Sequence, residues 1–297
     1  MVFVGCAETG YFVGRKLLEA GLLPQAIVSL DPSAIAKHKV SGYKCLFDLA
    51  PDVVHYQPQR YDLKSPLDYK FFSHNKYDIL VILGWQRLIP DPIIGTLGIC
   101  GLTIHGSAEG LPKGRGRSPL NWALIEGHRS FSLSLLTVEG GADAGRIIDT
   151  REFDILPADT IRTLYYKNGL ASAQMMIDKI PLLTRDSGVE QDDSLASYYP
   201  KRSPEDGCIK WAERAVDIEG LVRAVTRPYP GAFTYWNGQK LMIWQGQTFD
   251  TKLTTGCEPG RVGAVFPDGS FLVGTGTHDF LILDYEGPCP QEGDIFK

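Results

Sequence analysis

The chain has 297 residues, six cysteines and a formal net charge of −5, and these values already exclude several classes of protein. A chain of this length buries a substantial core without disulfide bonds. The cysteines include no Cys-x-x-Cys pair, so neither a disulfide framework nor a zinc ribbon is expected. Residues 203–297 carry 8 basic against 13 acidic side chains, which does not favour a nucleic-acid binder. Without a signal peptide or an apolar run of about 18 residues, we expect a cytoplasmic protein that does not enter the membrane.

The chain opens with the pattern of a strand, helix and strand unit. Its segments, in chain order, are an apolar strand at 3–6, a helix at 11–20 and a buried strand at 25–30. Gly5, Gly10 and Gly14 accompany the first turn, and Asp31 follows the second strand. They lack the Gly-x-Gly-x-x-Gly spacing of a dinucleotide site. We therefore interpret these glycines as residues that permit a tight turn and not as an NAD site.

Two further strands should lead into a ligand site. A continuous apolar run at 78–83 is typical of a strand that is covered on both faces of a parallel sheet. Residues 98–104 form another apolar segment and deliver His105 at its carboxyl end, where open α/β sheets bind their ligands. Next we expect a helix at 119–126, a strand at 131–138 and a glycine-rich turn at 139–145, which would place Asp143 at the same edge.

A polar stretch at 185–204 separates two different patterns and resembles a linker. Before it, residues 1–184 predict an α/β domain with a Rossmann-like parallel sheet. After it, a short helix at 215–226 precedes several strands that are broken by Asn-Gly, Pro-Gly and Asp-Gly turns. Residues 205–297 are therefore predicted to form a small C-terminal β-barrel domain of OB-like type.

His105 and Asp143 are the residues best placed to handle protons. A carboxylate beside an imidazole fixes its tautomer and favours its protonated form. Each also has an ordinary interpretation, since a histidine at a strand end is often structural and aspartate is favoured in turns. Arg115 and Arg117 either grip an anionic substrate or line a solvated loop. Thr103, on the same strand face as His105, either donates a hydroxyl to the site or fills a β-branched strand position.

Two other kinds of site are not favoured. The remaining histidines do not cluster at metal-ligand spacing, so no metal is expected. Ser107 and Ser118 lack the Gly-x-Ser-x-Gly elbow of a serine hydrolase.

Several motifs, in a fixed order, resemble those of the folate-dependent formyltransferases. In the first part of the chain they are Leu88-Ile89-Pro90, Thr103-Ile104-His105-Gly106-Ser107, residues 111–122 (LPKGRGRSPLNW) and Ala142-Asp143-Ala144-Gly145. Residues 202–211 and 227–233 are similar to the start of the barrel domain that the methionyl-tRNA enzymes share with the amino-arabinose enzymes. The resemblance covers nearly the whole chain and is strongest to the enzymes that N-formylate amino sugars.

This resemblance implies a role for each matched residue. His105 would be the general acid/base of formyl transfer and Asp143 its assistant. We also expect Thr103, which is not matched by the family pattern, to be a third catalytic residue. The donor would be 10-formyltetrahydrofolate, a diffusible co-substrate. Its expected contacts are Arg87, Leu88, Ile89, Arg117, Glu139, Gly140, Gly141, Ala142 and Asp143. The expected contacts of the acceptor are Ser107, Glu109, Lys113 and Arg115.

The sequence departs from the family pattern in two places. Most members have Asn-x-His, whose asparagine amide holds the tetrahedral oxyanion, whereas Thr103 stands here. Losing such a donor commonly costs about 10²–10³ in turnover, so Thr103, a water or His105 takes over or activity is altered. The loop at 105–112 is also two residues longer than usual, and it faces the acceptor.

For the acceptor, the sequence favours the amine of a nucleotide-linked amino sugar. Initiator tRNA is the first alternative, but residues 31–51 offer only Lys37, His38, Lys39 and Lys44 against two aspartates, little for a phosphate-rich partner. An unrelated amine stays open, and so does an inactive folate-binding or nucleotide-binding module, which Thr103 alone supports. A homodimer through the barrel domain also stays open.

Overall fold

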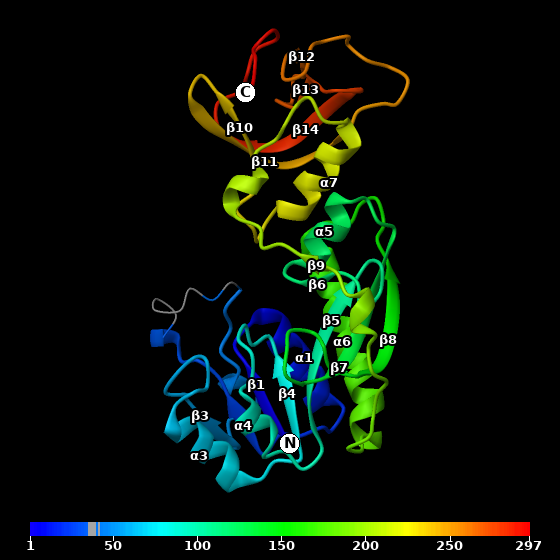
Figure 1. Ribbon diagram of the computed structural model, residues 1–297. Coiled ribbons are helices and arrows are strands. Elements are labelled where there is room, and N and C mark those ends of the chain that lie inside the picture. Colours follow the sequence, from blue (N-terminus) through cyan, green and yellow to red (C-terminus); the bar gives the residue numbers. More distant parts are fainter. Residues whose placement is uncertain (35–39, 41) are drawn as a thin grey trace. The chain divides into compact units, whose positions relative to one another are not determined.

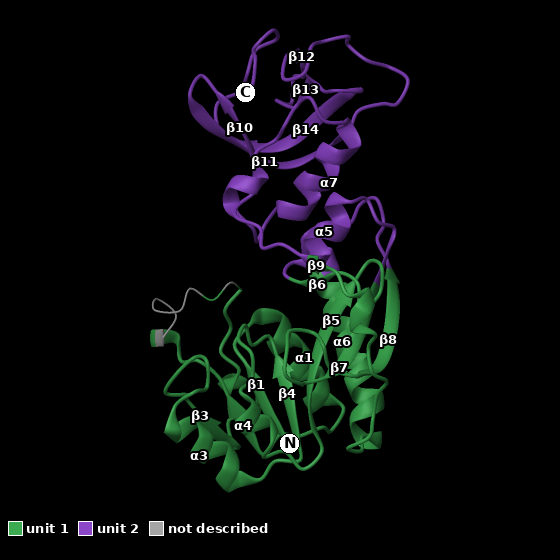
Figure 2. Cartoon of the chain, in the orientation of Figure 1, with its two compact units in different colours: residues 1–116, 132–153, 165–198 green, residues 117–131, 154–164, 199–297 purple. Residues whose placement is uncertain are grey.

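The computed structural model describes residues 1–34, 40 and 42–297, which form two compact units (Figure 2). The first consists of Met1–Gly116, Ser132–Phe153 and Tyr165–Tyr198, and the second of Arg117–Phe131, Asp154–Leu164 and Tyr199–Lys297. Lys37, His38 and Lys39, the basic residues considered for a phosphate-rich partner, lie outside the described residues. Across the described part of the chain, no helix has the length and apolar character that crossing a bilayer requires.

A seven-stranded sheet is the frame of the first unit, with the strand order β3-β2-β1-β4-β5-β7-β8 (Figure 1). The strands are β1 (Val2–Gly5), β2 (Ala26–Val28), β3 (Val54–Tyr56), β4 (Ile79–Leu83), β5 (Cys100–Ser107), β7 (Ser130–Thr137) and β8 (Ile147–Asp154). The first five strands in this order pair in parallel, whereas β7 pairs antiparallel with β5. The predicted Rossmann-like α/β class is confirmed.

The helices of this sheet are α1 (Glu8–Glu19), α3 (Pro66–Asn75), α4 (Asp91–Ile94) and α6 (Ile161–Lys179), with short 3-10 turns at Pro32–Ala34, Phe47–Leu49 and Ile180–Leu182. Helix α1 lies close against β4 because it presents glycine there. A Cβ atom on Gly10 would lie 1.9 Å from the carbonyl oxygen of Leu83, so any side chain would force the helix away. Close packing, more than a tight turn, accounts for this glycine.

The strand order creates a switch point between β1 and β4. The chain continues from β1 to β2 on one side and from β4 to β5 on the other, so a crevice opens at the carboxyl ends of these strands. Residues 84–89 leave β4 at this point. Strand β5 is longer than predicted, because it pairs with β7 as far as Ser107. His105 therefore lies inside the strand and not after its end.

The second unit contains α5 (Pro119–Ile125), α7 (Ala215–Val225) and a five-stranded antiparallel sheet with the order β10-β11-β14-β13-β12. Its strands are β10 (Ala232–Trp236), β11 (Gln239–Thr248), β12 (Val262–Val265), β13 (Phe271–Gly274) and β14 (Asp279–Glu286). Asn237 and Gly238 both have positive φ, 50° and 77°, which suits the tight β10–β11 hairpin. Helix α7 meets α5 at Gly220, where a Cβ would lie 2.6 Å from the Leu124 carbonyl oxygen.

The last residues of the chain bond to both edges of this sheet. Lys297 exchanges two backbone hydrogen bonds with Tyr235 of β10. On the other edge, the Phe296 N–H donates to Gly260 and the Gly293 N–H to Val262. The C-terminal segment thus joins the two edge strands, which supports the predicted barrel.

The stretch predicted as a linker contains short elements of its own. They are a 3-10 turn at Asp193–Leu195, strand β9 (Tyr198–Tyr199) and a 3-10 turn at Pro204–Gly207. Strand β9 pairs with β6 (Arg115–Gly116). The domain limits at 184 and 205 remain a prediction.

Candidate active site

His105 and Asp143 lie side by side in the first unit. The distance from His105 Nδ1 to Asp143 Oδ1 is 3.3 Å, and the side chains are 9% and 21% exposed. The other ring nitrogen, Nε2, lies 3.4 Å from the carbonyl oxygen of Gly114. A doubly protonated ring therefore has an oxygen acceptor on each nitrogen, and this largely buried pair can hold a proton at a defined position.

The turn between β7 and β8 gives Asp143 its position. Asp143 itself adopts the left-handed conformation with φ 57°, which aspartate tolerates better than most residues. The N–H of Gly116 donates to its second carboxylate oxygen at 3.2 Å. Gly145 lets the turn close, because a Cβ there would lie 1.8 Å from the carbonyl oxygen of Thr137.

The rest of the turn contains the predicted folate contacts Glu139, Gly140, Gly141 and Ala142, all of which are exposed. Glu139 is held locally, because its Oε1 accepts from the Thr137 hydroxyl at 2.7 Å and from Arg146 Nε at 3.2 Å. Because one carboxylate oxygen of Glu139 already accepts two hydrogen bonds within the protein, the backbone of the turn is the part most open to a ligand.

The segment after β4 combines apolar, cationic and unpaired polar groups. Leu88 is 65% exposed, whereas Ile89 is buried. The guanidinium of Arg87 lies 4.6 Å from the centre of the Tyr61 ring. Trp85 is buried beside Tyr61, and its indole Nε1 has no hydrogen-bond partner. A buried donor without a partner costs about 1–3 kcal/mol, so a bound acceptor at this position would relieve a real penalty.

Two of the predicted acceptor contacts, Ser107 and Arg115, have buried side chains. Ser107 is buried, and its Oγ accepts from the Glu109 N–H at 3.2 Å within its own turn. Arg115 is 1% exposed and donates to Asp193 at 2.7 Å and to Gln191 at 2.8 Å. Both side chains are buried and bonded within the protein, although the Arg115 Nε has no hydrogen-bond partner. Their roles as acceptor contacts stay predictions.

The other predicted acceptor contacts lie at the surface. Lys113 Nζ and Glu109 Oε2 form an exposed ion pair at 3.4 Å. Thr103 is partly exposed and shares with His105 the face of β5. Arg117 belongs to the second unit, so its predicted folate contact stays a prediction.

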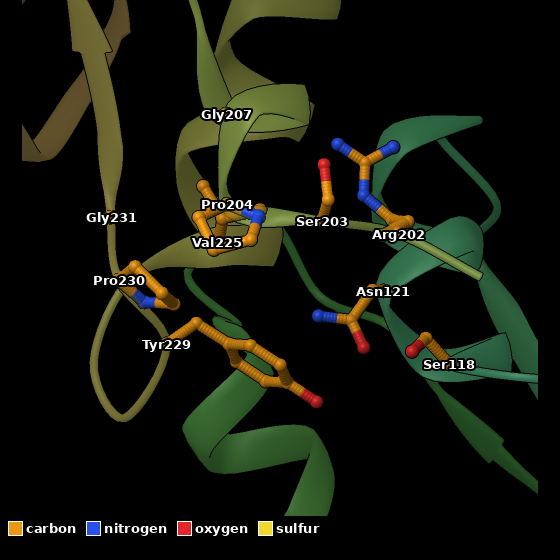
Figure 3. Close-up of a pocket in the computed structure, with 10 residues that line it drawn as sticks. All are labelled: Ser118, Asn121, Arg202, Ser203, Pro204, Gly207, Val225, Tyr229, Pro230 and Gly231. Atoms are coloured by element: carbon orange, nitrogen blue, oxygen red, sulfur yellow. The ribbon is translucent and has the colours of Figure 1, made fainter.

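The second unit contains a cavity of about 210 Å³ (Figure 3). Pro204, Tyr229 and Pro230 form one side of it, and Ser118, Asn121 and Arg202 the other. The Asn121 amide nitrogen donates to the Ala224 carbonyl at 2.7 Å, but its buried Oδ1 has no partner.

Four residues that the structure adds as candidate site residues were not predicted from the sequence: Trp85, Asn121, Arg202 and Tyr229. Three of them lie within the family motifs, and Trp85 lies three residues before Leu88-Ile89-Pro90. In the described ranges, no group of three His, Cys, Asp or Glu side chains is arranged to hold a metal ion.

Comparison with known protein families shows which family the chain belongs to. The N-terminal formyl transferase model matches residues 45–180, and the model of the formyl transferase C-terminal domain matches residues 201–291. The chain belongs to the formyl transferase family. Both of its halves carry the family pattern, and together the matches cover about three quarters of the chain.

The chain is also similar in sequence to part of a longer protein. It is 31% identical over 253 residues to the bifunctional polymyxin resistance protein ArnA of Wigglesworthia glossinidia brevipalpis. That match includes 84% of this chain but only 38% of ArnA, so the chain spans well under half of that relative.

Two solved structures share the fold over nearly the full length of both chains. The N-formyltransferase of Helicobacter canadensis, in complex with folinic acid and dTDP-3-aminofucose, has a TM-score of 0.64 at 15% identity and covers 96% of this chain and 98% of its own. The methionyl-tRNA formyltransferase of Clostridium thermocellum has a TM-score of 0.61 at 16% identity, with 96% of each chain covered.

Proposed function

We propose that this formyl transferase family member moves a formyl group from 10-formyltetrahydrofolate to the amine of a nucleotide-linked amino sugar. The observation that carries the proposal is the contact between His105 Nδ1 and Asp143 Oδ1 at 3.3 Å. A buried imidazole beside a carboxylate is suited to take up and return a proton during acyl transfer.

The reaction then follows from ordinary acyl-transfer chemistry. The neutral amine nitrogen bonds to the formyl carbon, and the carbonyl electrons move onto oxygen to form a tetrahedral oxyanion. His105 accepts the proton that the nitrogen loses. When the carbonyl re-forms, the bond from carbon to N10 of the folate breaks, and His105 returns the proton to N10. The products are the formamide and tetrahydrofolate.

The folate subsite is proposed between the segment after β4 and the Asp143 turn. Trp85 Nε1 supplies a buried donor without a partner, and exposed Leu88 supplies apolar surface. The backbone of the 139–143 turn supplies open polar groups. A flat heterocycle that has acceptors on one edge and an apolar face fits this set. Folinic acid, a folate, is bound in the similar Helicobacter canadensis enzyme.

The cavity of the second unit, considered by itself, is proposed to bind a nucleotide. Buried Asn121 Oδ1 has no partner and can accept an N–H from a base, while Tyr229 offers a ring for stacking. Arg202 supplies a cation for phosphate. A cavity of about 210 Å³ holds part of a nucleotide sugar and not the whole molecule. The bound dTDP-3-aminofucose of the Helicobacter canadensis enzyme belongs to the same ligand class.

The test is incubation with 10-formyltetrahydrofolate and either nucleotide-linked amino sugars or charged initiator tRNA, scored by the mass gain of one formyl group. We expect transfer to a sugar nucleotide, and loss of turnover by about 10²–10⁴ in His105→Ala with folate binding retained. Asn121→Ala should raise KM for the sugar nucleotide while leaving KM for the folate unchanged.

Three results would contradict this proposal. Transfer to tRNA and to no sugar would establish the methionyl-tRNA alternative. Folate binding without transfer to any amine would establish an inactive module. Full turnover in His105→Ala would refute the role of the histidine whichever acceptor is found.

A further inference from the structure

A group of three hydrogen-bonded residues binds the backbone on the two sides of the proposed reacting pair, His105 and Asp143. They are Arg115 of β6, Gln191 and Ser197, and we call them the clamp. We propose that the clamp is a positioning device that holds Asp143 and Gly114 on the two sides of His105. The inference rests on the proposed function, because it assigns the clamp to the geometry of formyl transfer.

Gln191 holds the Asp143 side. Its side-chain Nε2 donates to the carbonyl oxygen of Asp143 at 2.9 Å and to that of Gly145 at 2.7 Å. A glutamine amide has two donors and one acceptor group, and here both donors grip the backbone on either side of one residue. The Asp143 backbone has the left-handed conformation, which is unfavourable for a non-glycine residue. Two external hydrogen bonds counter the tendency of this turn to relax.

Ser197 holds the Gly114 side. Its Oγ accepts from the Gly114 N–H at 2.9 Å, and its carbonyl accepts from the Arg115 N–H at 2.9 Å. Gly114 is the residue whose carbonyl oxygen faces His105 Nε2. The Gly116 N–H, two residues on, binds the carboxylate of Asp143. A shift of this loop would therefore disturb both partners of the imidazole.

Arg115 connects the two sides. Its buried guanidinium donates to Gln191 Oε1 at 2.8 Å, to Asp193 at 2.7 Å and to the Tyr198 hydroxyl at 3.3 Å. The Oε1 contact fixes the orientation of the Gln191 amide, so that its nitrogen points to the Asp143 turn. A buried cation that is held by several acceptors costs much to move. Residues 191–198, within the segment predicted as a linker, are therefore hydrogen-bonded to the residues on both sides of the reacting pair.

If the clamp positions the reacting pair, substitution of a clamp residue should lower turnover and change substrate binding little. Gln191→Ala should lower kcat by about 10- to 100-fold, because displacements of about 1 Å cost that much, while KM for both substrates changes by less than about 2-fold. Gln191→Glu keeps the acceptor for Arg115 but loses both donors, and it should lose turnover to a similar extent.

Ser197→Ala and Ser194→Ala form a matched pair. Both serines are exposed, but among the residues that the structure describes the Ser194 hydroxyl bonds only to Asp192. Ser194→Ala should keep wild-type kcat, whereas Ser197→Ala should lower it. Hydrogen exchange gives a readout without catalysis, and amides at 112–118 and 139–147 should exchange faster in the Gln191 and Ser197 variants than in Ser194→Ala.

The outcomes separate the clamp from the proposed function. If the wild-type protein transfers no formyl group, the function fails, but faster exchange in both segments still supports the clamp. Wild-type kcat and wild-type hydrogen exchange in folded Gln191→Glu and Ser197→Ala would overturn it. A Gln191→Ala protein that does not fold leaves these two variants to decide.

Discussion

His105 has an oxygen atom beside each of its two ring nitrogens. Its two nitrogens face Asp143 and the Gly114 carbonyl. A neutral imidazole can donate to only one of these oxygens, whereas the protonated ring donates to both. In the proposed reaction, this doubly protonated ring is the form that exists after His105 has taken the proton of the amine, and stabilising that form would speed the reaction.

Thr103 is the residue that we expect to donate a hydrogen bond to the oxyanion of the tetrahedral intermediate. It is partly exposed and lies two residues before His105 on the same face of β5, so its hydroxyl can reach the same space. Thr103→Val keeps the shape and removes the donor. We expect kcat to fall by about 10²-fold, the usual cost of losing an oxyanion donor, with KM for the folate unchanged, as measured by steady-state kinetics.

Thr150 offers the matched control for this substitution. It is an exposed threonine on β8 of the same sheet, and its hydroxyl bonds to Ser134 at 3.0 Å. Thr150→Val should keep wild-type kcat. Unchanged turnover in Thr103→Val would show that another group holds the oxyanion.

At the scale of elements, the tight closure of the turn between β7 and β8 limits which residues it can contain. The predicted Cβ clash at Gly145, 1.8 Å from the Thr137 carbonyl oxygen, involves backbone and cannot be relieved by a side-chain rotation. Gly145→Ala should therefore lower the free energy of unfolding by about 2–3 kcal/mol, measured by urea denaturation. Turnover should fall as well, because Gln191 also binds the Gly145 carbonyl.

Gly140 in the same turn is the control. A Cβ there would approach only Asp91 Oδ1, at 3.7 Å, which is an ordinary contact. Gly140→Ala should change the free energy of unfolding by less than about 0.5 kcal/mol. Equal destabilisation by both substitutions would show that the clash at Gly145 is not the cause of the lower free energy of unfolding.

Elements were well predicted where a local pattern was strong. The apolar run at 78–83 is strand β4 (Ile79–Leu83), and the helical spacing at 215–226 is α7 (Ala215–Val225). The end of β5 was wrong by three residues, since pairing with β7 continues through Gly106 and Ser107. Such an extension depends on a partner strand that no local pattern reveals.

At the scale of the whole molecule, the thiols predict how stability depends on pH. Burial raises the pKa of Cys6 to about 11 and that of Cys100 to about 11, whereas an unperturbed thiol titrates near about 8.5. The unfolded chain therefore loses these protons first as the pH rises. Their stabilising contribution is complete below about pH 8.5 and is lost progressively as the pH rises through about 11.

Urea denaturation at pH 8 and pH 10.5 measures this effect. The wild-type protein should lose on the order of 1–2 kcal/mol per buried thiol between the two conditions. Cys6→Ala should show a smaller loss, because its titration is removed, while the exposed Cys289 can be replaced by alanine without effect. An identical pH dependence in wild type and Cys6→Ala would contradict the assignment.

The sequence by itself determined the α/β class, the barrel of the second part and the pair His105 and Asp143, because these follow from local apolar patterns and ordered motifs. Only the tertiary structure decided which polar side chains turn inward. Arg115 binds Gln191 and Asp193, which are 76 and 78 positions away, and Gln191 binds Asp143 at a separation of 48. A loop exposed to solvent and a loop whose side chains are buried can have the same amino-acid composition. Burial and hydrogen bonds to residues distant in the sequence distinguish the two only after the chain has folded.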